Sequence, residues 1–285
     1  MNRNELNSAL KCAVNAARAA GALMRQHLHS PKIINEASRH DIKLELDVRC
    51  QQLIERHLRK DFPAFSVLGE EGSSGPADAP ARWVVDPIDG TVNFAHNVPH
   101  ACVCVALQVR GPRFKVQRPT SAPRSRKVAP SSIVHSPESH QTVIGVVYDP
   151  FCDELWTATR GQPARMNGRV IHVSRRAKLA EAMVCVGLSK SQMTLKKTLP
   201  YFGWVARRTR KIRLMGAAGL GLAYVACGRF DAYAECRVRL WDIAAGALIV
   251  ECAGGQFWCE RLGGFEAYRM LASNGRLHDQ LPTPR

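Results

Sequence analysis

The chain has 285 residues, 46% of them hydrophobic, which is enough to bury a substantial core in one large domain or two closely joined ones. No apolar run approaches the roughly 18 to 20 residues that span a bilayer, and residues 1–11 lack a signal peptide's apolar stretch, so we expect a cytoplasmic protein without membrane contact. The net charge of +16 is concentrated in residues 160–213, where fourteen Lys or Arg face one acid, Glu181.

The first part of the chain predicts helices followed by strands. Apolar residues recur at spacings of three and four between residues 6 and 28, and at every fourth position over residues 47–62, which predicts two amphipathic helices. Short apolar runs that each stop at a turn then predict five strands, at residues 65–68, 82–85, 101–109, 142–148 and 154–159.

A stretch without apolar period separates this part from an α/β part. Residues 112–140 are rich in Pro, Ser and basic side chains, which indicates a loop or disordered insertion at a sheet edge. After residue 210 the pattern is strand, helix, strand, helix, at residues 212–215, 217–227, 230–235 and 243–253, and it favours a layered α/β arrangement. We expect an N-terminal α+β subdomain over residues 1–142 and a C-terminal α/β subdomain over residues 143–285.

The run WVVDPIDGT carries two carboxylates at a strand end. Asp86 and Asp89 lie three residues apart on a turn held by Pro87, and paired hard oxygen ligands suit Mg²⁺. Gly90 lets backbone N–H groups approach a phosphate, and Thr91 adds a hydroxyl. The alternative is an Asx-type turn in which the aspartates only cap backbone groups.

Two further acids follow or precede apolar runs. Glu70 comes directly after a predicted strand, where an exposed acidic turn is the alternative interpretation. Asp242 precedes the apolar run IAAGALIV, so it is a candidate helix N-cap, although a carboxylate at a helix start can also bind metal.

The ten cysteines are scattered through apolar segments and indicate reduced core residues rather than a disulfide framework. Cys102 and Cys104 alternate with Val along a predicted strand without convincing zinc spacing. We interpret them as packing residues, because a free thiol behaves as a small buried hydrophobe.

Taken together, these segments resemble the inositol monophosphatase family of lithium-sensitive, magnesium-dependent phosphatases. The matching runs are GEEG at 69–72, WVVDPIDGTVNF at 83–94, GVVYDPFCDELWTATRG at 145–161 and WDIAAGALIVECAGG at 241–255. The resemblance implies a mixed α+β, layered αβαβα sandwich of the sugar-phosphatase type with two closely packed subdomains. It also implies two or three Mg²⁺ ions and a homodimer.

The resemblance also assigns roles to residues. It implies metal ligation by the side chains of Glu70, Asp86, Asp89 and Asp242 and by the carbonyl of Ile88. It implies catalytic roles for Glu70, Asp86 and Thr91, with Glu70 and the Thr91 hydroxyl helping to orient a metal-bound water. The residues it places at the substrate are Gly90, Thr91, Gly216, Ala217, Glu235 and Asp242, with Asp47 as an outer acid near the metals.

The chain departs from the family pattern near the outer metal. Lys43 and Leu44 stand where the family has a Val-Thr pair, and Glu36 stands where it tends to have a Lys. Pro163 replaces a flexible position of a Gly-rich segment. We expect the departures at residues 36, 43 and 44 to alter metal affinity.

The expected activity is a phosphoric monoester hydrolase that acts on inositol monophosphate or a similar small polyol phosphate through a metal-activated water. Fructose 1,6-bisphosphate, histidinol phosphate and 3′-phosphoadenosine 5′-phosphate stay open as substrates. Arg237 and Arg239 suit a second phosphate or simply face water. A different class of function, contact with RNA or the transcription machinery, is suggested by the basic residues of 160–213, which we interpret first as a solvated surface.

Overall fold

The structure is a computed structural model that describes residues 1–37, 42–111, 140–188 and 192–284. The expected insertion at 112–140 therefore lies outside the described residues, except for His140. Among the residues described, no helix is long and apolar enough to cross a membrane.

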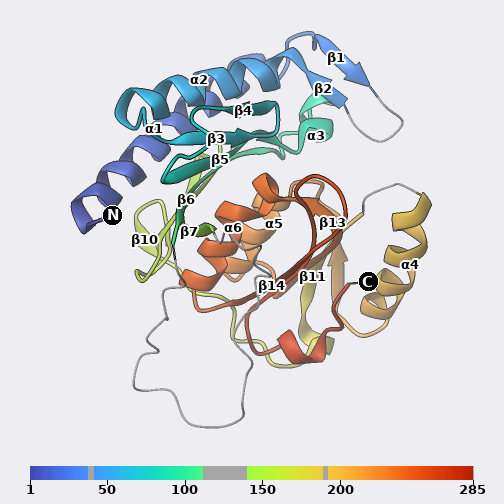
Figure 1. Ribbon diagram of the computed structural model, residues 1–285. Helices are drawn as coiled ribbons and strands as arrows, with labels where there is room; N and C mark the ends of the chain where they lie inside the picture. The colour runs from blue at the N-terminus through green and yellow to red at the C-terminus, as the bar shows by residue number, and fades with distance from the viewer. Residues whose placement is uncertain (38–41, 112–139, 189–191, 285) are drawn as a thin grey trace.

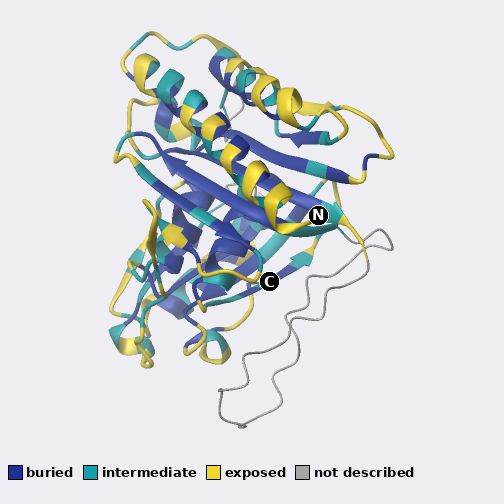
Figure 2. Cartoon of the chain, turned by 90° about the vertical axis from the view of Figure 1, so that its left-hand side faces the viewer, coloured by how far each residue is buried: buried dark blue, intermediate teal, exposed yellow. Residues whose placement is uncertain are grey.

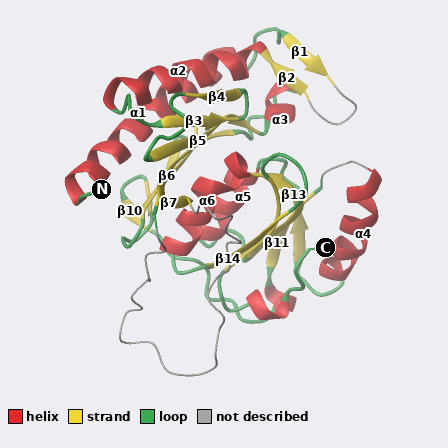
Figure 3. Cartoon of the chain, in the orientation of Figure 1, coloured by secondary structure: helices red, strands yellow, loops and turns green. Residues whose placement is uncertain are grey.

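Five layers stack in the order helices, sheet, helices, sheet, helix (Figure 1). Two helices cover the outer face of a large sheet, two lie between that sheet and a smaller one, and one covers the smaller sheet's outer face (Figure 3). These helices are, in the same order, α1 (Arg3–His27) and α2 (Glu45–Asp61), α5 (Ala218–Ala226) and α6 (Leu240–Cys252), and α4 (Gln192–Ala206). The expected αβαβα sandwich is confirmed.

The large sheet has eight strands in the order β10-β9-β8-β7-β6-β5-β3-β4. All neighbours are antiparallel except β3 and β5. The strands are β3 (Ser66–Gly69), β4 (Gly72–Ser74), β5 (Ala81–Asp89), β6 (Cys102–Arg110), β7 (His140–Asp149), β8 (Glu154–Thr159), β9 (Arg165–Met166) and β10 (Arg169–Val170).

The smaller sheet has five strands in the order β12-β11-β13-β15-β14, with β11 parallel to both of its neighbours. They are β11 (Met183–Gly187), β12 (Lys211–Arg213), β13 (Ala232–Arg239), β14 (Gln256–Arg261) and β15 (Ala267–Ser273). A separate hairpin joins β1 (Ile34–Ala37) to β2 (Ile42–Leu44), and the short helix α3 (Thr91–Ala95) follows β5.

Both faces of the large sheet are buried, because helices cover each of them. Val84 packs toward α5 and α6, whereas its neighbours Trp83 and Val85 pack toward α1 and α2. Burial on both faces explains why its strands read as nearly continuous apolar runs. In Figure 2 these strands are mostly dark blue, while α1, which crosses in front of them, is exposed on its outer side.

The predicted elements are all present, and all but β8 have shifted ends. The two expected N-terminal helices are α1 and α2, and the strand expected at 82–85 continues to Asp89 as β5. The elements that the sequence patterns did not indicate are β1, β2, β4, α3, β9, β10, β11, α4, β14 and β15. The chain passes from the large sheet to the smaller sheet between β10 and β11. The expected subdomain boundary at residue 142 lies inside β7, and the division into two subdomains at that residue stays a prediction.

Candidate active site

The turn that ends β5 is shaped by its own side chains. The pairing of β5 with β6 shifts register between Asp86 and Asp89, which bends the strand end. Asp86 Oδ1 accepts a hydrogen bond from the N–H of Ile88 at 3.1 Å, so the Asx-type contact is present alongside any other role. Gly90 has a φ of 91°, and a Cβ there would lie 3.0 Å from the carbonyl oxygen of His100. Only glycine fits this position without strain.

Thr91 and Asp47 connect this turn to α2. The Thr91 hydroxyl donates to the carbonyl of Ile88 at 2.8 Å and lies 3.3 Å from Asp47 Oδ1. Asp47 is 2% exposed, and its Oδ2 accepts the N–H of Leu44 at 2.7 Å. Leu44, one of the departures from the family pattern, buries its side chain in the core between the large sheet and its outer helices.

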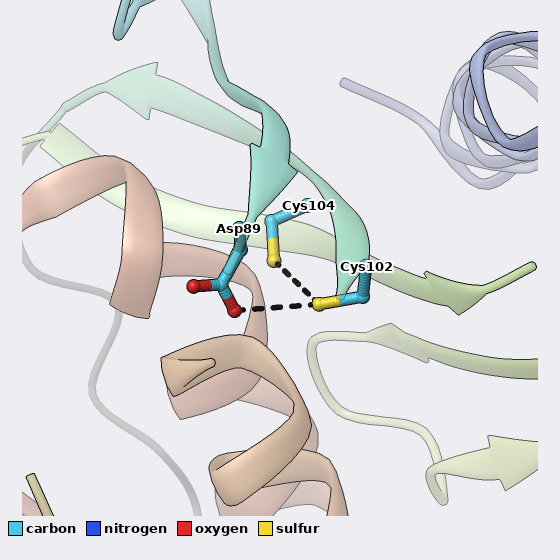
Figure 4. A group of neighbouring side chains, drawn as sticks. All are labelled: Asp89, Cys102 and Cys104. Carbon is cyan, nitrogen blue, oxygen red and sulfur yellow. Dashed lines mark hydrogen bonds between the residues drawn. The ribbon is translucent and has the colours of Figure 1, made fainter. Parts of the chain in front are cut away.

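Asp89 connects the large sheet to the first turn of α5. Its Oδ1 accepts the N–H of Ala218 at 3.0 Å and its Oδ2 the N–H of Gly219 at 2.6 Å. A carboxylate at a helix N-terminus is stabilised by the exposed N–H groups there. The thiol of Cys102 also donates to Asp89 Oδ2, at 3.3 Å (Figure 4).

Asp242 lies in the first turn of α6 but is not its N-cap, which corrects the alternative considered above. The strand β13 runs directly into the helix, so Arg239 occupies the N-cap and α6 begins at Leu240. Asp242 Oδ2 accepts the Arg239 N–H at 2.8 Å, and the carboxylate therefore caps the helix from its third position.

Four carboxyl groups crowd together where these elements meet. Burial, with Asp242 and Asp47 nearby, raises the pKa of Glu70 to about 9. Burial and the neighbouring Glu70 raise the pKa of Asp86 well above its usual value. Burial and Asp89 raise the pKa of Asp242 to about 8, whereas burial raises the pKa of Asp89 only to about 6, because backbone N–H groups offset it.

Such a group of acids is a donor set for a hard cation. Each carboxylate disfavours ionisation of the others, and a divalent cation would reverse that penalty. Carboxylate and carbonyl oxygens are the ligands that Mg²⁺ prefers, so the side chains of Glu70, Asp86, Asp89 and Asp242 fit this metal chemically.

Glu235 lies on β13 just before a register shift in its pairing with β15. The hydroxyl of Tyr233 donates a hydrogen bond to Glu235 Oε2, and burial raises the pKa of Glu235 to about 7. Gly187 of β11 pairs with Glu235, and a Cβ at that glycine would lie only 2.1 Å from Oε2. The carboxylate therefore occupies space that only a glycine leaves open.

The expected substrate turn lies beside the end of β5. The side-chain amide of Asn93 donates to the carbonyls of His100 and Met215, each at 2.9 Å, and so holds the two loops together. A Cβ on Gly90 would lie 3.2 Å from the Cβ of Ala217. The turn at Gly216, whose φ is 76°, is thus adjacent to the candidate phosphate loop.

Several of these contacts were not predicted from the sequence. Asn93 and Gly187 support the site through partners that are distant along the chain or lie on another strand, so no local pattern indicates them. Tyr233 lies two residues before Glu235 on β13, but the sequence does not show that its hydroxyl contacts that carboxylate. One arginine of β13 contacts the loop between β14 and β15: Arg239 Nη1 donates to the carbonyl of Phe265. A Cβ added at Gly264 in the same loop would lie 3.5 Å from Arg237 Nη2.

Comparisons with known proteins agree with this arrangement. The model of the inositol monophosphatase family matches residues 5–113 and 136–282. "Inositol monophosphatase 2" of Solanum lycopersicum is 34% identical over 278 residues, which cover 94% of each chain. "Nus factor SuhB" of Pseudomonas aeruginosa is 37% identical over 255 residues, covering 86% of this chain and 83% of that protein. The crystal structure of extragenic suppressor protein suhB from Bartonella henselae superposes with a TM-score of 0.81 at 29% identity and covers 96% of each chain.

Proposed function

Because this chain belongs to the inositol monophosphatase family and is therefore a phosphatase, we propose that it is a magnesium-dependent phosphomonoesterase of inositol monophosphate or a similar small polyol phosphate. The observation that carries this proposal is that the carboxyl groups of Glu70, Asp86, Asp89 and Asp242 are buried and lie near enough to one another to raise the pKa values of Glu70, Asp86 and Asp242. Hydrolysis of a phosphate ester needs neutralised phosphoryl oxygens and an activated water, and this donor set supports both.

We assign the metal to the Glu70, Asp86, Asp89 and Asp242 side chains and the Ile88 carbonyl. When bound, two or three Mg²⁺ ions would neutralise the phosphoryl oxygens and lower the pKa of the attacking water. The N–H groups of Gly90 and Thr91 bind the phosphate at the start of α3, where backbone donors suit an anion. Glu70 and the Thr91 hydroxyl orient the attacking water, and Asp47 positions that hydroxyl.

The substrate's alcohol part is assigned to Gly216, Ala217, Asp242 and Glu235. A half-buried carboxylate beside the site favours a partner with several hydroxyl groups. The hydrogen bond from Arg239 to the Phe265 carbonyl engages this guanidinium group with the β14–β15 loop, which favours a substrate with a single phosphate over a bisphosphate.

A phosphate-release screen tests the function. The substrates are inositol 1-phosphate, fructose 1,6-bisphosphate, histidinol phosphate and 3′-phosphoadenosine 5′-phosphate, each with and without Mg²⁺. We expect magnesium-dependent release that Asp89→Asn abolishes and Li⁺ inhibits, with inositol 1-phosphate preferred. Release that a chelator leaves unchanged would refute the metal mechanism.

A second candidate function is contact with RNA. The run Arg207, Arg208, Arg210, Lys211 and Arg213 is exposed throughout, and the Arg208 guanidinium lies 4.5 Å from the centre of the Trp204 ring. The Nus factor name of the Pseudomonas aeruginosa relative supports a transcription-associated role. RNA binding that falls steeply with salt and survives Asp86→Asn would support it, and binding unchanged when the five cations become Gln would contradict it.

We also propose a cytoplasmic homodimer. All ten cysteines are free, which is typical of a reducing compartment. The homodimer rests on family membership alone, and light scattering of the purified chain would test it.

A further inference from the structure

Two thiols that the proposed reaction does not use lie next to Asp89. Cys102 and Cys104 project from the same face of β6, and both are completely buried. Cys102 Sγ lies 3.3 Å from Asp89 Oδ2 and 3.8 Å from Cys104 Sγ (Figure 4). One oxygen and two sulfur atoms thus lie within 4.8 Å of one another.

These separations match the spacing of ligands around a tetrahedral metal ion. Two thiolates that each lie about 2.3 Å from a zinc ion are about 3.8 Å apart when the angle at the metal is tetrahedral. A carboxylate oxygen at about 2.1 Å would then lie about 3.6 Å from each sulfur. Both separations given above are close to these values.

The helix α5 leaves the space between the three atoms without a side chain. Gly219 lies opposite them, and a Cβ there would be 2.4 Å from Cys104 Sγ, 3.0 Å from Cys102 Sγ and 3.1 Å from Asp89 Oδ2. The three donor atoms therefore pack closely against the backbone of Gly219, and any side chain at this position would displace them.

We propose that Asp89, Cys102 and Cys104 form a binding site for a thiophilic divalent metal ion of the Zn²⁺ or Cd²⁺ class. On binding, each thiol releases its proton to solvent, and the metal ion replaces the proton that now links Cys102 to Asp89. Three protein ligands leave the fourth tetrahedral position to a water molecule. Mg²⁺ does not compete for the sulfur atoms, because hard cations prefer oxygen ligands.

The site would make the enzyme sensitive to such metals. Asp89 is also a ligand of the proposed magnesium site. A metal ion held by the two thiolates and Asp89 therefore deprives the magnesium site of this carboxylate. The expected result is inhibition by micromolar Zn²⁺ or Cd²⁺ that a thiol chelator reverses. This inhibitory effect rests on the proposed function, whereas the binding itself does not.

Titration of the full, reduced chain with Cd²⁺ in excess Mg²⁺ tests the binding. We expect a thiolate-to-cadmium charge-transfer band in the ultraviolet that saturates at one tight equivalent. Cys102→Ala and Cys104→Ala should each lose this band and weaken the tight equivalent at least tenfold. Cys259→Ala is the matched control, because it removes a buried thiol of the smaller sheet, and it should keep the band.

The same variants separate this proposal from the proposed function. A band of unchanged intensity and affinity in both Cys102→Ala and Cys104→Ala would overturn the site, whatever the phosphatase activity. Thermal unfolding without metal checks that each variant folds, and Cys104→Ser, which conserves size, replaces Cys104→Ala if that variant does not. If the chain releases no phosphate from any substrate but binds Cd²⁺ as expected, the proposed function fails and the thiolate site stands.

Discussion

The side chain of Glu235 is positioned in part by Gly187, a residue that has no side chain of its own. Its carboxylate accepts the Tyr233 hydroxyl and occupies the space beside Gly187 on the neighbouring strand. The carboxyl group is therefore held by one hydrogen bond and by the shape of the sheet. The sequence could identify Glu235 only through the family resemblance, because Gly187 becomes its neighbour only when β11 pairs with β13.

Gly187→Ala tests this positioning. The new methyl group overlaps Glu235 Oε2, so the carboxylate must move, and we expect KM for inositol 1-phosphate to rise about tenfold, about 1.4 kcal/mol of binding, with kcat nearly unchanged. Gly263→Ala is the control, since a Cβ there meets no atom within 4 Å. Equal kinetics for Gly187→Ala and the parent protein would show that Glu235 does not contact the substrate.

The acid cluster predicts how stability depends on pH and metal. Without metal, the folded-state pKa values of Glu70, about 9, and Asp242, about 8, lie above the values of the unfolded chain. Between about pH 4.5 and pH 9 the folded state therefore binds more protons, and the free energy of unfolding falls as pH rises. Because Mg²⁺ favours the ionised carboxylates, it should raise the melting temperature more at about pH 8 than at about pH 6. Scanning calorimetry with Mg²⁺ or with EDTA measures both shifts, and equal shifts would contradict the prediction.

At the scale of elements, the site depends on where strands end and helices begin. The run WVVDPIDGT predicted a strand that ends before a turn at Pro87. The strand is confirmed, but β5 continues to Asp89 and the turn begins at Gly90. The approach of α5 to Asp89 was not predictable, because it depends on contacts between residues about 130 positions apart. Pro200 lies inside α4, and an internal proline disfavours a helix assignment from sequence alone.

Gly219→Ala should disturb the contact between α5 and the large sheet. A Cβ at this position would lie 2.4 Å from the buried Cys104 sulfur, so the first turn of α5 must shift away from Asp89. We expect a loss of about 1–3 kcal/mol in the free energy of unfolding, measured by urea denaturation, together with weaker stabilisation by Mg²⁺. Gly203→Ala in α4 is the matched control, because its Cβ would meet only the flexible end of Arg207. That variant should be neutral or more stable by up to about 1 kcal/mol, and a similar loss in both would contradict the proposed clash.

At the scale of the whole molecule, the five layers enclose three hydrophobic cores, and the candidate active site lies where the layers meet. Its acids come from β5, from the residue after β3 and from α6, so no single layer contains the site. The layered class was predictable from the alternation of strands and helices in the last part of the chain. The order of the strands was not, because adjacent strands such as β13 and β15 are separated by α6 and β14.

The pairing of β6 with β7 predicts that the chain tolerates a large deletion. Arg110 and His140 are register partners on these antiparallel strands, so the two ends of the intervening segment already lie side by side. Replacing residues 111–139 by an Asn-Gly turn should close a hairpin of ordinary geometry. We expect magnesium-dependent phosphate release and the melting temperature to be retained. Insoluble or unfolded protein, judged by circular dichroism, would show that the segment is needed for folding.

The exposed cations around β12 have a consequence that is independent of any ligand. β12 forms one edge of the smaller sheet, and an open strand edge invites pairing with another chain. Lys211 and Arg213 lie on that edge, with Arg207, Arg208 and Arg210 just before it. Like charges on two such edges repel each other, so we expect the arginines and the lysine of the proposed RNA contact also to oppose edge-to-edge aggregation.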